Sequence, residues 1–107
     1  MKTLTAIALV AALATPAGAD DKGNYPANHS CQRVLQNYNT RSRVWTEELA
    51  WIFGYADGFR ASTNIDPFKY GDPAVGVAVF CQQAPHGTLR DAMNAYTRYA
   101  TEMAGSQ

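Results

Sequence analysis

The chain has 107 residues with nine Lys or Arg, nine Asp or Glu and two His side chains, so its formal net charge at neutral pH is zero. This balance gives no basic patch of the kind that binds nucleic acid or an anionic membrane. Beyond the N-terminal segment, no apolar run approaches the roughly 20 residues that a membrane-spanning helix needs. The composition therefore predicts a small protein that binds neither nucleic acid nor membranes.

The first twenty residues, MKTLTAIALVAALATPAGAD, have the pattern of a secretory signal peptide. Lys2 supplies a positive charge, residues 4–13 form an apolar stretch, and residues 17–19 (AGA) match the small-residue cleavage pattern. We predict a signal peptide over residues 1–19, cleavage before Asp20, and export to the periplasm or beyond the cell. A retained membrane anchor is the alternative. The exported chain would carry one more acidic than basic side chain.

Residues 20–29 are polar and contain glycine and proline, which predicts a flexible N-terminal tail with His29 at the surface. The helical domain is expected to span residues 30–107. It begins with a short helix that Ser30 caps. The apolar face of that helix is expected to hold Cys31, Val34, Leu35 and Tyr38.

A long second helix is predicted between about Trp45 and Phe59, because its apolar residues recur at spacings of three and four. Glu47 and Glu48 lie near its start, where negative charge suits the helix dipole. The stripe expected to be buried consists of Trp45, Leu49, Ile52, Phe53, Ala56 and Phe59.

The same helix carries two further patterns. Gly54 and Gly58 lie four residues apart, which favours a flat lane where another backbone packs closely; a weak helix end is the alternative. Trp51 and Tyr55 form an aromatic pair rotated away from the main stripe. We expect this pair either to meet a further helix or to provide a surface for a dimer or a client protein.

The second half of the chain predicts two more helices. After a loop over residues 64–71, Asp72 and Pro73 mark the start of a short helix that ends near Gln83. This helix is expected to direct Val75, Val79 and Phe80 inward. Thr88 begins the last helix, whose apolar face is expected to hold Leu89, Ala92, Met93, Tyr96, Ala100 and Met103. Because no segment alternates like a strand, the predicted fold class is all-α: a single domain of two long and two short helices.

The chain contains two cysteines, Cys31 and Cys81. In an exported protein an even number of cysteines favours a disulfide, which here would tie the first helix to the third. A catalytic thiol with His86 and a metal site remain alternatives. A nucleophile needs an oriented base and zinc needs four ligands, and the sequence arranges neither. We therefore expect no enzyme activity, no metal and no cofactor.

Three stretches resemble the HdeA/HdeB family of periplasmic acid-stress chaperones, taken broadly. They are Cys31 with Leu35, the helix WIFGYADGF at residues 51–59, and FCQQAPHGTLRDAMNAY at residues 80–96. Members of that family show an aromatic residue before a cysteine, a proline four residues after the cysteine, and then a Thr-Leu helix start. Phe80-Cys81, Pro85 and Thr88-Leu89 fall at those places.

The resemblance implies a protein that is dimeric at neutral pH and loosens in acid, exposing apolar surface that holds unfolded periplasmic proteins without ATP or a cofactor. Near pH 2 the exported chain would have a formal charge of about +11, which favours loosening. The alternative is an immunity-type or inhibitor protein that binds one specific partner and has no chaperone activity. We expect periplasmic localisation and protein partners for both readings, with a homodimer for the first.

Overall fold

A computed structural model describes residues 25–106; the predicted signal peptide and the start of the predicted tail lie outside them. The described residues contain two long helices, α3 (Arg43–Thr63) and α5 (Leu89–Gly105), and two short ones, α2 (Cys31–Thr40) and α4 (Pro73–Gln83). Two 3-10 turns, η1 (Pro26–Asn28) and η2 (Pro67–Tyr70), precede α2 and α4. The described chain contains no strand, so the predicted all-α class is confirmed.

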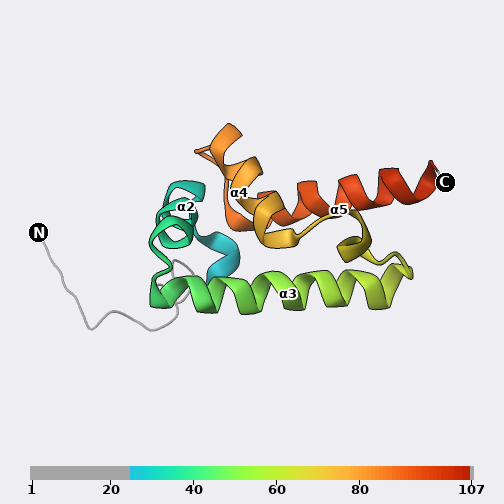
Figure 1. The fold of residues 1–107 in the computed structure, drawn as a ribbon, viewed down its shortest axis with the longest axis horizontal. Coiled ribbons are helices and arrows are strands. Elements are labelled where there is room, and N and C mark those ends of the chain that lie inside the picture. The colour runs from blue at the N-terminus through green and yellow to red at the C-terminus, as the bar shows by residue number, and fades with distance from the viewer. Residues whose placement is uncertain (1–24, 107) are drawn as a thin grey trace, which may run out of the picture.

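Helix α3 runs along one side of the molecule, and the other three helices lie across from it (Figure 1). Helix α5 points toward the same end as α3, while α2 packs near the start of α3 and α4 lies against both α2 and α5. The core between these helices contains Cys31, Val34, Trp45, Ile52, Ala56, Val77, Cys81, Leu89, Ala92, Met93 and Tyr96. Within residues 25–106, no helix is long and apolar enough to cross a membrane.

The helices begin where the sequence places capping side chains. The Ser30 hydroxyl accepts a first-turn backbone N–H of α2 at 3.2 Å, and the Asp72 carboxylate accepts one of α4 at 2.8 Å. At α5 the Thr88 hydroxyl and the Asp91 carboxylate accept each other's backbone N–H, at 3.2 and 3.0 Å. This reciprocal capping box confirms the predicted start of the last helix.

The two cysteines form the predicted disulfide, which joins the first residue of α2 to the end region of α4. Their Cα atoms are 4.9 Å apart, and both side chains are fully buried. The bond spans a sequence separation of 50 residues. In the chain-entropy model, a closure of this length stabilises the fold by about 4 kcal/mol.

The prediction for the inward face of α4 is right for Phe80, which is partly buried against the core, and wrong for the two valines. Val75 and Val79 are 51% and 48% exposed, whereas Val77 is fully buried. The disulfide explains the difference, because Cys81 must face α2 and the residue four positions earlier on a helix shares its face. That residue is Val77, so the two flanking valines turn outward.

The prediction for α3 is right in its centre and wrong at one edge. Trp45, Ile52 and Ala56 are buried, but Phe53 is 40% exposed. The buried stripe is narrower than expected, and Phe53 stacks on Phe68 of η2 with ring centroids 5.9 Å apart.

Within residues 25–106, no backbone closely approaches Gly54 and Gly58, and an approach by another molecule stays a prediction. A Cβ atom built at either glycine would meet nothing within 4 Å. Both glycines are exposed, on a side of α3 that the described elements leave uncovered. Neither glycine is therefore needed for a close approach within the described chain.

The end of the predicted tail is part of the packed domain. Residues 26–28 form η1, with Ala27 fully buried, and His29 is only 2% exposed. The backbone explains this, since the His29 carbonyl accepts the Leu89 N–H at 2.9 Å and the Gly87 carbonyl accepts the Cys31 N–H at 2.9 Å. These two bonds hold the segment before α2 against the start of α5, so the prediction of a surface histidine is wrong.

Candidate functional site

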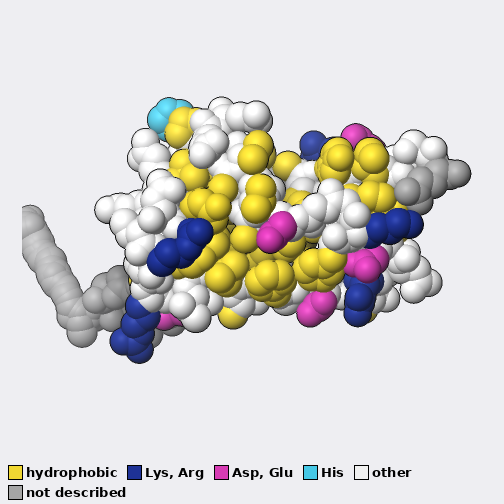
Figure 2. All heavy atoms as spheres, viewed as in Figure 1, with side chains coloured by type: hydrophobic (Ala, Val, Ile, Leu, Met, Phe, Trp, Pro, Cys, Tyr) yellow, Lys and Arg dark blue, Asp and Glu magenta, His cyan; other side chains and the backbone are white. Residues whose placement is uncertain are grey.

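The outer side of α4 lies within a band of exposed apolar side chains, which we call the α4 surface: Phe53, Val75, Val79 and Tyr99. Each of the four is between 40% and 51% exposed. Figure 2 shows hydrophobic side chains gathered across the middle of this face of the molecule. Large exposed apolar patches rimmed by polar residues mark interaction sites on soluble proteins. The α4 surface is therefore the candidate binding surface.

Two grooves flank α4 and join its valines to the neighbouring helices. The groove toward α5 has a volume of about 390 Å³, and its lining includes Val79, Phe80, Tyr96 and Tyr99. All the residues that line it are uncharged. Such a groove offers a place for an apolar side chain of another molecule and presents no ionic partner.

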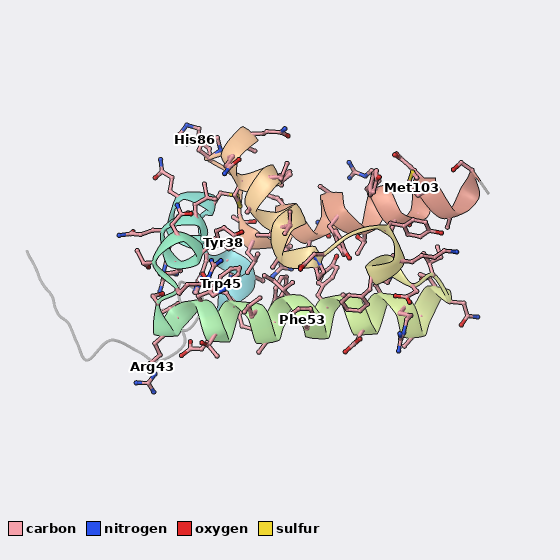
Figure 3. The ribbon with its side chains drawn as sticks, in the orientation of Figure 1. Tyr38, Arg43, Trp45, Phe53, His86 and Met103 are labelled. Atoms are coloured by element: carbon pink, nitrogen blue, oxygen red, sulfur yellow. A yellow bond between two sulfur atoms is a disulfide. The ribbon has the colours of Figure 1, made fainter. Side chains whose placement is uncertain are left out.

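The groove on the other side of α4, toward α3, has a volume of about 360 Å³. Val75 and Phe53 line it together with two charged residues, Arg41 and Asp72. The Arg41 guanidinium lies 4.4 Å from the centre of the Tyr38 ring. The rings of Tyr38 and Trp45 meet edge to face where α2 approaches α3 (Figure 3). This groove is more polar than the first and less suited to a purely apolar ligand.

Trp51 and Tyr55, the aromatic pair predicted as a dimer or client surface, lie partly buried against the core. Their rings contact each other with centroids 5.3 Å apart. The Trp51 indole N–H donates to the Tyr25 hydroxyl at 3.3 Å, and the Tyr55 hydroxyl donates to the Asn94 side chain at 2.6 Å. Their role in contacts with another molecule stays a prediction, and the more exposed apolar side chains lie around α4.

A buried polar cluster lies where η1, α2 and α3 meet. The Nδ1 atom of His29 is 2.6 Å from the Oε2 atom of Glu48, and the Glu48 side chain is completely buried. The Asn37 amide donates to both oxygens of the same carboxylate, at 3.2 Å each. The Ser42 hydroxyl in turn donates to the Asn37 amide oxygen at 2.9 Å. Several donors therefore surround a carboxylate that water does not reach.

Sequence reasoning missed this cluster. Glu48 was expected to serve the helix dipole, but it lies in the buried stripe of α3, three residues after Trp45 and four before Ile52. An acidic residue at a core position of an apolar stripe was the available signal, because such a residue must have buried partners. The identity of the partner could not be read, since His29 comes from a segment without periodicity.

The residues considered for catalysis or metal binding do not form a site. Cys81 is buried in the disulfide, and His86 lies exposed in the turn between α4 and α5 (Figure 3). Within residues 25–106, no three His, Cys, Asp or Glu side chains are grouped so that they would hold a metal ion. The geometry in the described part of the chain thus consists of an apolar surface and a separate buried polar cluster.

Comparison with known proteins gives no further assignment: no protein-family model, no curated protein and no solved structure shows significant similarity to this chain.

Proposed function

We propose that this protein is an exported, ATP-independent holdase of the HdeA/HdeB type, which binds apolar segments of unfolded proteins and acts under acid stress in the periplasm. The observation that carries the proposal is the α4 surface: apolar side chains on three helices, with an uncharged groove beside them. Unfolded proteins expose apolar side chains of varied sequence. A shallow apolar surface with little charge binds such segments without selecting one partner.

Two further features support the proposal. The disulfide joins α2 to α4, so it would keep the chain compact when acid weakens the packing around it. Near pH 2 the exported chain would have a formal charge of about +11, and self-repulsion between these charges would loosen the helices. Loosening would add buried apolar side chains to those that α4 already exposes. The predicted signal peptide supports export.

The test is suppression of client aggregation by the purified mature protein at pH 7 and at pH 2–3. We expect suppression to be stronger in acid. Replacing both valines, Val75→Ser with Val79→Ser, should weaken client binding about tenfold or more, because the two lost apolar contacts are together worth on the order of 1.4 kcal/mol at least. Met103→Ser is the matched control. Met103 is also exposed, at 36%, but lies at the far end of α5 (Figure 3).

Failure to suppress aggregation at either pH, with the helices intact in acid, would overturn the holdase proposal. The same scaffold would then serve the alternative function, binding of one specific protein partner. Equal loss of binding in the valine variant and the Met103→Ser control would show that the α4 surface has no special part in client binding.

A further inference from the structure

The groove between α4 and α5 has one face of each helix as a wall. On α4 its lining runs from Gly76 to Gln83, and on α5 it runs from Ala92 to Tyr99. The lining residues of α5 recur at spacings of three and four, so they form a single stripe of that helix. At 1.5 Å per residue each wall is about 10 Å long, which is about two helical turns. The groove therefore has the length of two turns of a further helix.

This groove offers few hydrogen-bonding groups to a ligand. Its lining is uncharged, and its polar side-chain atoms belong to Gln83, Tyr96 and Tyr99. The Tyr96 hydroxyl is already bonded to the Pro67 and Gly71 carbonyls, at 3.0 and 2.8 Å. Residues 25–106 contain no strand whose edge would pair with an extended segment. An extended segment in the groove would therefore leave much of its backbone without partners, which is costly where water is excluded. A helix avoids this cost, because it bonds its backbone groups internally.

The groove on the other side of α4 adds charges that a ligand can match. Arg41 and Asp72 line it, next to Val75. The Arg41 guanidinium lies over the Tyr38 ring and donates to the Tyr38 carbonyl, and it has no salt-bridge partner among residues 25–106. A guanidinium has five N–H donors, so most of them remain for a ligand. A helix lying along α4 would match these charges with an acid toward Arg41 and a base toward Asp72, while its other flank faces the uncharged groove.

We propose that the α4 surface binds an amphipathic helix of a partner protein, whose apolar residues enter the groove between α4 and α5. Val75 and Val79 lie four residues apart on α4 and form a ridge of the kind that packs into the groove of a second helix. The partner's apolar residues recur at positions i, i+3, i+4 and i+7, and an acid on its flank contacts Arg41. This helix-binding role rests on the holdase function proposed above and names the form in which clients are held. Proteins loosened by acid keep much of their secondary structure while their apolar faces become exposed.

The test is fluorescence anisotropy at pH 7 with three labelled synthetic peptides of about 18 residues, a length at which an alanine-rich chain forms a helix. The helix peptide carries leucines at i, i+3, i+4 and i+7 and a glutamate on one flank. The second peptide has the same composition, but its leucines are distributed around the helix. The third keeps the leucines in place and carries a central proline, which breaks the helix. We expect the helix peptide to bind about tenfold more tightly, or better, than the other two. Equal affinity for the proline peptide, or no binding of any peptide, would overturn the proposal.

Variants in the groove locate the bound helix. Ala95 is half-buried in the lining on α5, so Ala95→Gln places a longer polar side chain in the groove and keeps a good helix former. We expect binding of the helix peptide to weaken about tenfold or more. Ala61→Gln is the matched control at an exposed position of α3 outside the groove. Equal affinities of the two variants, both folded by circular dichroism, would contradict binding in this groove.

The charge pairing is tested separately. Arg41→Gln should weaken the helix peptide about two- to fivefold at low salt, as expected for an exposed ion pair. It should leave the affinity unchanged for a peptide whose flanking glutamate is glutamine. Arg43→Gln is the matched control, because the Arg43 side chain at the start of α3 points away from α4 (Figure 3). An equal effect of Arg41→Gln on both peptides would contradict the pairing of Arg41 with the acid.

Two outcomes separate the helix site from the proposed function. If the helix peptide binds in the groove but client aggregation is not suppressed at either pH, the helix site stands and the holdase function fails. The bound helix would then belong to one specific partner. If aggregation is suppressed while the three peptides bind equally, the holdase function stands and the preference for a helix is wrong.

Discussion

Two buried polar contacts anchor this bundle, and they differ in the elements that they connect. The first is the His29–Glu48 pair with the Asn37 amide, at the junction of η1, α2 and α3. The second is Tyr96 of α5, whose hydroxyl is 3.0 Å from the Pro67 carbonyl and 2.8 Å from the Gly71 carbonyl. The first ties helices to the start of the described chain, and the second ties α5 to the turn before α4.

The second anchor has a pH dependence that follows from its burial and from nearby charges. Burial, together with the charges of Asp72 and Asp66, raises the pKa of Tyr96 to about 12. Tyrosine in water has a pKa of about 10, so Tyr96 stabilises the fold fully below pH 10, and this contribution is lost as the pH rises toward 12. A phenol shared by two carbonyls therefore serves as a fixed contact at neutral and acid pH.

Of the changes that we predict, loss of the disulfide should lower the free energy of unfolding the most. Cys31 lies two residues after His29, so the bond holds the first anchor to α4 and does not touch Tyr96. Reduction, or the double replacement Cys31→Ser with Cys81→Ser, should lower the free energy of unfolding by about 4 kcal/mol. Urea unfolding of the oxidised and reduced protein measures this difference. Coinciding transitions would show that the bond contributes little.

Tyr96→Phe tests the second anchor alone. It leaves two carbonyl groups without the hydroxyl donor, so we expect a loss of about 1–3 kcal/mol in the free energy of unfolding. The decrease in the free energy of unfolding between pH 10 and pH 12 should become smaller as well. The decrease on going from pH 7 into acid should stay the same. Tyr99→Phe is the matched control, since Tyr99 is half exposed on the same helix. A change in acid sensitivity in Tyr96→Phe would argue against the separation of the two anchors.

Thr88→Ala tests the start of α5, to which the backbone of His29 is hydrogen-bonded. The variant loses the hydroxyl that accepts the Asp91 N–H at 3.2 Å, which should lower the free energy of unfolding by about 1 kcal/mol. Thr101→Ala, at an exposed position later in α5, should change stability much less. Thermal unfolding of the two variants side by side gives the comparison, and equal effects would mean that the capping box has no special weight.

Substitutions at two glycines are expected to change stability with opposite signs. Gly58→Ala adds a Cβ atom in open space on α3, so we expect a gain of about 0.5–1 kcal/mol in the free energy of unfolding. At Gly76 of α4 a Cβ would lie 3.1 Å from the Tyr96 ring, which its two hydrogen bonds hold in place. Gly76→Ala should therefore lower the free energy of unfolding by roughly 1–3 kcal/mol.

Denaturant unfolding of both glycine variants, with sedimentation at several protein concentrations, checks these signs. A loss of self-association in Gly58→Ala would reveal that a second copy packs on the lane that the two α3 glycines leave open. Stabilisation by Gly76→Ala would contradict the close approach of Tyr96 to α4.

Sequence patterns alone determined where three of the four described helices begin and which cysteines pair. Ser30, Asp72 with Pro73, and Thr88 with Asp91 are local signals, because a capping side chain bonds to backbone groups two or three residues away. With two cysteines in the described helices, an intramolecular disulfide has only one pairing. These features need no knowledge of distant parts of the chain.

Only the tertiary structure decided which way α4 is turned and what His29 does. Apolar residues surround most of α4, so its periodicity selects no face, and the direction of the disulfide places Val77 inside and Val79 outside. His29 is buried because the start of α5 binds its backbone and α3 supplies Glu48 to its ring. Both outcomes depend on residues far away in sequence. A local pattern does not indicate which distant residue a side chain will contact.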